Sequence, residues 1–296
     1  AHLNDTHSHL ESEEINLIIN STPITLRIGG FARIKTLVSE MRKEDSDLLL
    51  LHAGDAVQGT LYFNLFNGKP EFDLLNILDV DAMTFGNHEF DRGIKPIPDW
   101  IKQSNFPWLS ANINFDYEPT IAPFVKPFII KDIKGERVAV IGVTTELTPQ
   151  LTMDVGRAIF TDPVDAIRRY VTILTSMGIN KIILLSHLGY EQDVDLASKI
   201  AGVDIIVGGH SHTLLGDKKA LSLIGLTPKG SYPTEIRAPD GRKVVVLQAW
   251  QWGYVVGKII ARFSEDGEIK ECTPHIIIPL GSTFKKDGVD IPNGTE

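Results

Sequence analysis

The sequence is organised around residues 83–91, which read Met83-Thr84-Phe85-Gly86-Asn87-His88-Glu89-Phe90-Asp91. The apolar start is typical of a buried strand, and the glycine marks its end. A possible metal ligand (Asn87), a titratable imidazole (His88) and a carboxylate (Asp91) then follow within five residues. Each is a common surface residue, so the meaning of this stretch depends on what the rest of the chain brings to it.

The composition describes an ordinary globular protein. The chain has 296 residues, of which 43% are hydrophobic and 23% charged, enough for one large domain or two small ones. No apolar run reaches the roughly 18–20 residues that a transmembrane helix needs. The net charge of −9 argues against nucleic acid as a partner, because that needs a basic face. An acidic protein with anionic substrates must neutralise them locally, and bound cations would do so.

The number of cysteines and the first residues of the chain indicate the cellular compartment of the protein. Cys272 is the only cysteine, so neither an internal disulfide nor a thiolate zinc cluster is possible. This fits a cytoplasmic protein or a bacterial periplasmic one. Polar residues of the ligand type begin at His2, where a signal peptide would be apolar. We therefore expect either a protein that is not exported or a processed or trimmed chain, and we favour the second.

Predicted strands alternate with predicted helices in the middle of the chain, which indicates the α/β class. A helix over residues 162–177 has an N-cap at Asp162 and a stop at Gly178. Spacing predicts a hairpin of residues 124–132 and 137–144, and a final strand pair of residues 243–249 and 255–263. From Ser264 the pattern decays into proline, glycine and charge.

Several conspicuous side chains receive structural interpretations. Trp250 and Trp252 are expected to pack at a sheet edge, and the phenylalanines at 63, 66 and 72 to lie in the core. His9, His52 and His275 have no partner at ligand spacing, and His2 lies within a strand.

Five predicted strand ends carry residues that can bind metal. They hold Asp5 and His7, then Asp55, then Asn87 with His88, then His187, and finally His210 with His212. Ligand sites of α/β sheets gather at the carboxyl ends of the strands, so we expect these residues to meet. Asp5 and His7 are two residues apart, and in an extended chain both would point to one face.

Without His88, these positions supply three oxygen donors and four imidazoles, too many for one ion. Two ions that share a carboxylate account for the set, and mixed donors suit Zn, Mn, Fe or Co better than Ca or Mg. Two metals roughly 3.5–4 Å apart can hold a hydroxide between them for in-line displacement at phosphorus. His88 lies beside the ligand Asn87 and can protonate the leaving oxygen, while Asp91 can hold its tautomer.

The order of these motifs resembles the calcineurin-like metallophosphoesterases, and most closely their 5′-nucleotidase and UDP-sugar hydrolase branch. The likeness covers residues 2–280 and includes the Leu109–Ile113 and Tyr232–Thr234 segments. It rests mainly on five motifs: Asn4-Asp5-Thr6-His7-Ser8-His9, Gly54-Asp55-Ala56-Val57-Gln58-Gly59-Thr60, Gly86-Asn87-His88-Glu89-Phe90-Asp91, Ser186-His187-Leu188-Gly189 and Gly208-Gly209-His210-Ser211-His212.

The resemblance implies a four-layer α/β/β/α sandwich with mixed sheets. It implies one metal on Asp5, His7, Asp55 and His212, and a second on Asp55, Asn87, His187 and His210. Asp55 bridges, and His88 and Asp91 form the catalytic dyad. It also implies an exported protein, periplasmic or at the cell surface, with a second, substrate-binding domain. We therefore expect a catalytic domain over residues 1–265 and the start of a linker over residues 266–296.

The function implied is two-metal hydrolysis of nucleoside 5′-monophosphates by a metal-bridging hydroxide. A 2′,3′-cyclic nucleotide phosphodiesterase or a UDP-sugar hydrolase would use the same centre, and a sulfur-ester hydrolase is a more distant alternative. The alternative from another class is a metal-binding domain with little activity of its own. A broken dyad or missing ligands would indicate it, and all seven donors and the dyad are present.

Overall fold

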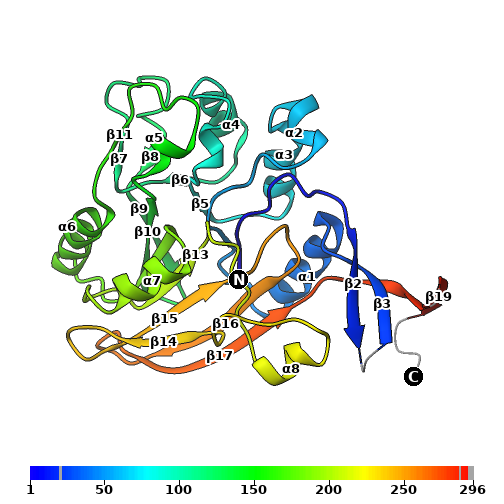
Figure 1. Ribbon diagram of the computed structural model, residues 1–296. Coiled ribbons are helices and arrows are strands. Elements are labelled where there is room, and N and C mark those ends of the chain that lie inside the picture. Colours follow the sequence, from blue (N-terminus) through cyan, green and yellow to red (C-terminus); the bar gives the residue numbers. More distant parts are fainter. Residues whose placement is uncertain (20–21, 287, 293–296) are drawn as a thin grey trace.

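A computed structural model describes residues 1–19, 22–286 and 288–292. Two large sheets face each other, with helices on both outer sides (Figure 1). The first sheet has the order β17-β16-β1-β4-β5-β6-β8. Its strands are β1 His2–Leu3, β4 Leu51–His52, β5 Ala82–Thr84, β6 Trp108–Leu109, β8 Val125–Lys126, β16 Val256–Phe263 and β17 Ile269–Ile277.

The second sheet has the order β14-β15-β13-β12-β10-β9. Its strands are β9 Phe128–Ile133, β10 Glu136–Thr144, β12 Ile182–His187, β13 Ile205–Gly208, β14 Thr234–Arg237 and β15 Lys243–Gln248. Strands β10, β12, β13 and β15 run parallel, as do β1, β4, β5, β6 and β8 of the first sheet. The carboxyl ends of the central strands therefore lie along one edge of each sheet.

Three apolar layers hold the sheets and helices together. Alternate residues of β10 show the arrangement: Val140 packs between the two sheets, whereas Ala139 and Ile141 pack under the helices. The helices are α1 Phe31–Glu44, α2 Leu61–Phe66, α3 Lys69–Ile77, α4 Ile97–Gln103, α5 Thr148–Leu151, α6 Pro163–Ser176, α7 Tyr190–Ala197 and α8 Lys218–Ser222. The expected four-layer α/β/β/α sandwich is confirmed.

Two small sheets complete the fold. Strand β7 Ile113–Asn114 pairs with β11 Ile159–Phe160. A four-stranded sheet joins β2 Glu13–Ile19 and β3 Thr22–Ile28 to β18 Leu280–Lys286 and β19 Val289–Pro292, so blue and red segments lie side by side in Figure 1. In the part of the chain that the model describes, no helix has the length and apolar character needed to cross a membrane.

Local signals are confirmed where they are strong. The Asp162 carboxylate accepts a hydrogen bond from the Asp165 N–H, and Gly178 follows the helix with φ of 74°. The hairpin of β9 and β10 turns at Lys134 and Gly135.

Three predictions are wrong. Strands β15 and β16 do not pair, because the chain crosses between the sheets at residues 249–255; β15 joins β13, and β16 joins β1. The chain after Ser264 is not irregular, since β17 pairs along β16 and β18 joins β3. Many side chains of β17 point to solvent, so its apolar pattern is weak. Phe66 is 54% exposed, whereas Phe63 and Phe72 lie in the core.

The stability of this fold should depend on pH through Asp204, just before β13. Its buried carboxylate accepts a hydrogen bond from Ile182 N–H at 2.8 Å. Burial raises the pKa of Asp204 from 3.8 to about 7. The folded state thus holds a proton that the unfolded state releases, and this contribution to stability is lost as pH rises from about 4 to about 7. In Asp204→Asn, urea unfolding of metal-free protein should show a smaller loss of stability between pH 5 and pH 8. Equal losses in variant and parent would contradict this origin.

Candidate metal centre

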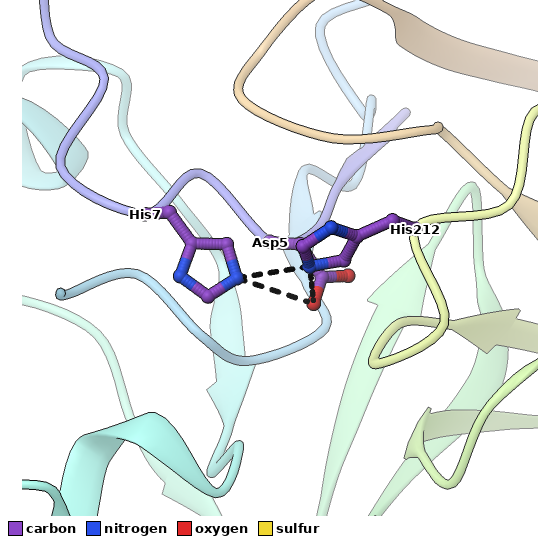
Figure 2. Close-up of side chains that lie close together, drawn as sticks. All are labelled: Asp5, His7 and His212. Atoms are coloured by element: carbon purple, nitrogen blue, oxygen red, sulfur yellow. Dashed lines mark hydrogen bonds and ion pairs between the residues drawn. The ribbon is translucent and has the colours of Figure 1, made fainter. Parts of the chain in front are cut away.

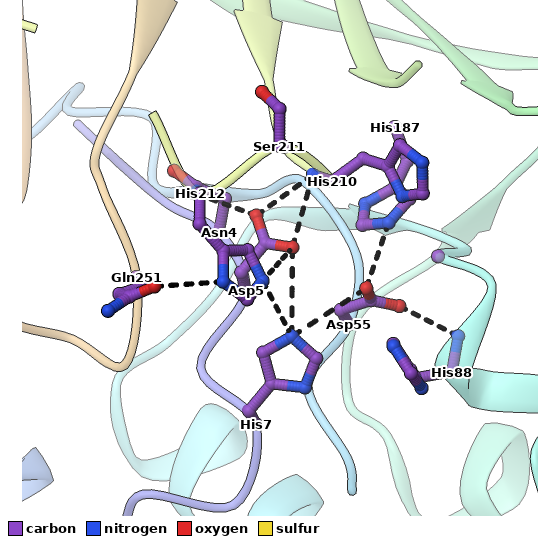
Figure 3. Close-up of polar contacts among 12 residues, drawn as sticks. Asn4, Asp5, His7, Asp55, His88, His187, His210, Ser211, His212 and Gln251 are labelled. Carbon is purple, nitrogen blue, oxygen red and sulfur yellow. Dashed lines mark hydrogen bonds and ion pairs between the residues drawn. The ribbon is translucent and has the colours of Figure 1, made fainter. Parts of the chain in front are cut away.

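All nine residues of the predicted site lie together where the two sheets meet. Figure 3 labels all of them except Asn87 and Asp91. The first sheet contributes Asp5 and His7 after β1, Asp55 after β4, and Asn87 with the 3₁₀ turn η1 His88–Phe90 after β5. The second contributes His187 at the end of β12, and His210 with His212 after β13. The strand-edge rule therefore holds for two sheets at once.

The backbone after β1, β4 and β13 is left-handed at the site residues, not extended. Asp5, His7 and Asp55 have φ of 49°, 47° and 55°, and His210 and His212 have 73° and 49°. Such residues cost of order 1–3 kcal/mol each and persist only where their surroundings fix them. Here the Asp5 and His7 N–H groups donate to the carbonyls of Gly54 and Asp55, both at 3.0 Å. The expectation that an extended chain aligns Asp5 with His7 is wrong, although both side chains reach the same place.

Glycines allow the loops to approach this closely. Gly54 has φ of 86°, and a Cβ there would lie 2.6 Å from Gly86 N and 2.7 Å from His187 Nδ1. A Cβ on Gly86 would lie 2.1 Å from Asp55 Oδ1. A side chain at either position would push Asp55 or His187 out of place.

The first donor group contains Asp5, His7 and His212 (Figure 2). The Nε2 atoms of His7 and His212 are 3.0 Å apart, and Asp5 Oδ1 lies 3.8 Å and 3.3 Å from them. His7 Nδ1 faces the Gln58 carbonyl at 3.1 Å, and His212 Nδ1 faces Gln251 Oε1 at 2.8 Å. Carbonyl oxygens only accept hydrogen bonds, so each Nδ1 carries the proton. The two Nε2 atoms then face each other beside the Asp5 carboxylate, an arrangement that suits a cation held by all three.

The second donor group contains Asp55, Asn87, His187 and His210. His187 Nε2 lies 3.0 Å from Asp55 Oδ2 and 3.3 Å from Asn87 Oδ1. His210 Nδ1 lies 2.9 Å from the same amide oxygen. His187 donates from Nδ1 to the Ala53 carbonyl at 2.6 Å, which fixes the ring with Nε2 toward Asp55 and Asn87. Asp55 Oδ2 is also 3.8 Å from His7 Nε2, so this carboxylate lies between the two groups.

Burial and charge prepare these residues to bind cations. Burial lowers the pKa of His7, and it lowers the pKa of His210 to about 4, so both rings are neutral near pH 7. Burial opposes ionisation of Asp55, but the facing His187 holds the pKa of that carboxyl far below its usual range. Asp5 and Asp55 are 0% and 1% exposed. These two buried carboxylates, with the neutral rings of His7 and His210 beside them, form a strong cation site.

His88 and Asp91 stand beside the donors. His88 Nδ1 lies 2.5 Å from Asp91 Oδ2, and the rings of His88 and His7 are 5.0 Å apart. The backbone N–H of His88 donates to Asp55 Oδ1 at 2.8 Å, which ties the dyad to the central carboxylate. Burial lowers the pKa of His88, but the hydrogen bond to Asp91 and the charge of Asp55 outweigh it and raise the pKa to about 9.

Sequence reasoning missed two supporting residues. Glu89 is fully buried and accepts backbone hydrogen bonds from Gly86 at 2.6 Å, Ala56 at 2.8 Å and Asp55 at 3.0 Å, so it joins the turns after β4 and β5. Burial raises its pKa to about 7. Gln251 orients His212. Glu89 belongs to the Gly86–Asp91 motif, but residue spacing alone indicates neither the role of Glu89 nor that of Gln251.

A family model described as calcineurin-like phosphoesterase matches residues 1–214. The probable 5′-nucleotidase of Treponema pallidum is 37% identical over 295 residues, which cover 99% of this chain and 49% of that protein. The structure of a 5′-nucleotidase precursor from Thermus thermophilus aligns with TM-score 0.88 and 39% identity, over 94% of this chain and 54% of that one. The NAD nucleotidase of Haemophilus influenzae aligns with TM-score 0.91 and 34% identity, over 99% and 53%.

The chain thus spans about half the length of these relatives. The family match covers most of the chain and includes all the donors and the dyad. By sequence and by fold, the chain belongs to the calcineurin-like phosphoesterases.

Proposed function

We propose that this chain carries the catalytic centre of a metal-dependent phosphoester hydrolase that acts on nucleotides, with nucleoside 5′-monophosphates as the first candidate. The observation that carries the proposal is the pair of donor groups joined at Asp55, with the His88–Asp91 dyad beside them. Relatives that are named 5′-nucleotidases and a NAD nucleotidase support nucleotides as the substrate class.

Two divalent cations are proposed, one for each donor group. Asp5, His7, Asp55 and His212 would hold the first, and Asp55, Asn87, His187 and His210 the second. The mixture of imidazole, carboxylate and amide donors favours Zn, Mn, Fe or Co. When bound, the cations would supply an activated water and positive charge for the transferring phosphoryl group.

His88 is the proposed general acid. At neutral pH a ring with a pKa near 9 carries protons on both nitrogens, and Asp91 occupies Nδ1. Nε2–H is then available to the leaving oxygen of a phosphate ester. Asp91 holds the ring in place and stabilises its charge, so the two residues act as one unit.

The relatives also support a larger protein around this centre. Because they are about twice as long, we propose that a further domain contributes substrate contacts. Because β17 pairs along β16 of the first sheet, we also propose that the catalytic unit extends beyond the expected boundary at residue 265, at least to the end of β17. The exported location implied by the resemblance stays a prediction.

Removal of the central carboxylate should abolish metal binding. Asp55 faces both donor groups, so Asp55→Ala should retain less than one metal equivalent after dialysis, where the parent retains two. Elemental analysis of the dialysed proteins measures this directly. Asp47→Ala, at an exposed aspartate, serves as the control and should retain two. Two tightly held equivalents in Asp55→Ala would refute the shared carboxylate.

Loss of the general acid should leave the metals in place. His88→Ala should keep two metal equivalents and lose roughly 10²–10⁴-fold in turnover. Turnover of the parent should also fall as pH rises through the pKa of His88, since the protonated ring is the active form, and the variant should lack this alkaline limb. His275→Ala, at an exposed histidine, is the control. Near-normal turnover in His88→Ala would show that the dyad is misassigned.

Substrate class is tested by parallel assays of the Mn- or Zn-loaded protein, both as this chain and in its longest natural form. AMP should be hydrolysed fastest. A preference for 2′,3′-cyclic AMP or UDP-glucose would select one of the alternatives. If the longest form hydrolyses none of these nucleotides and no bis-p-nitrophenyl phosphate, the enzyme proposal is wrong and the chain is a metal-binding domain without catalytic activity.

A further inference from the structure

The imidazole donors differ in what fixes their tautomer. His187 Nδ1 is held by the carbonyl of Ala53, and His7 Nδ1 by the carbonyl of Gln58. Both acceptors are backbone atoms and cannot turn away without a change in the loop. His212 Nδ1 is held instead by a side chain, Gln251 Oε1, at 2.8 Å (Figure 3). The side chain of His212 is 33% exposed, whereas that of His187 is fully buried, so packing alone restrains His212 less.

The loop between β15 and β16 presents Gln251 to the first donor group. The neighbours of Gln251, Trp250 and Trp252, have φ of 55° and 59°. Trp252 N–H donates to the Asp5 carbonyl at 2.7 Å, and Trp250 N–H donates to the Thr213 carbonyl at 3.2 Å. The loop is therefore fastened next to Asp5 on one side and His212 on the other.

Two side chains strengthen this attachment. The Asn4 amide donates to the Trp250 carbonyl at 2.7 Å and to Asp5 Oδ2 at 2.7 Å. The Trp252 ring stacks on His9 with centroids 4.4 Å apart and an angle of 13°. The two tryptophans thus anchor the loop, and Gln251 lies between them with its amide oxygen toward the metal ligand.

We propose that Gln251 is a positioning residue that sets the metal affinity of the first donor group alone. It keeps the proton of His212 on Nδ1 and turns the Nε2 lone pair toward Asp5 and His7. Its contact with this group runs through His212, while in the second group the backbone carbonyl of Ala53 holds His187. The inference rests on the metal centre of the proposed function and concerns binding, not turnover.

The test compares Gln251→Leu, which fills the space without an acceptor, with Gln251→Glu, which keeps one. Gln150→Leu, at an exposed glutamine of α5, is the matched control. Each protein is equilibrated in Mn²⁺ buffers of graded free concentration, and bound metal is counted by elemental analysis. Absorption of the Co²⁺-loaded proteins reports ligand geometry, and melting of the metal-free proteins reports the fold.

We expect Gln251→Leu to bind one equivalent with parental affinity and the other roughly 10- to 100-fold more weakly. Its Co²⁺ spectrum should lose the component of the weakened position. Gln251→Glu should restore both features, and metal-free melting should be the same in all four proteins.

Two equivalents bound by Gln251→Leu with parental affinities would overturn the inference. So would equal weakening of both equivalents with a lowered metal-free melting temperature and no rescue by glutamate, since that indicates a structural role only. A parent that binds fewer than two equivalents would overturn both the inference and the proposed metal centre. If the parent binds two but hydrolyses no phosphoester, only the proposed function falls.

Discussion

The arrangement depends on one buried carboxylate. Asp55 lies at the junction of the two sheets and is 1% exposed. One of its oxygens accepts the His88 N–H of the first sheet, and the other faces His187 of the second at 3.0 Å. A buried charge of this kind needs opposite charge nearby. The loops converge on Asp55 at distances that only glycine permits, and Glu89 fixes their turns through three backbone N–H groups. A site for cations is the consequence.

The same geometry gives neighbouring residues different roles. Asn87 and His88 are adjacent in the chain, yet the amide oxygen of Asn87 faces His187 and His210 while the ring of His88 turns to Asp91. The histidine rings are also oriented in two different ways. Backbone carbonyls face Nδ1 of His7 and His187, whereas a side chain faces Nδ1 of His212. If the two proposed cations bind here, backbone atoms would hold the ligands of one position and a single side chain would adjust the other.

The sequence predicts what local signals encode. Capping at Asp162 and the stop at Gly178 mark helix α6, and strand ends rich in ligand-type residues mark the site. Prediction from the sequence fails where contacts between residues far apart in the chain determine the structure. Strand β16 pairs with β1 rather than with β15, its neighbour in the chain, and no pattern in either strand reveals this. Asp5 and His7 meet through left-handed turns that residue spacing does not indicate. Glu89 and Gln251 act on groups 33 to 39 residues away.

The most direct test of the account is anomalous diffraction from crystals grown with Mn²⁺. The account predicts two peaks roughly 3.5–4 Å apart, one on either side of the Asp55 carboxylate, with His7 and His212 at one peak and His187 and His210 at the other. A single peak, or two peaks without Asp55 between them, would contradict the shared carboxylate on which the whole interpretation depends.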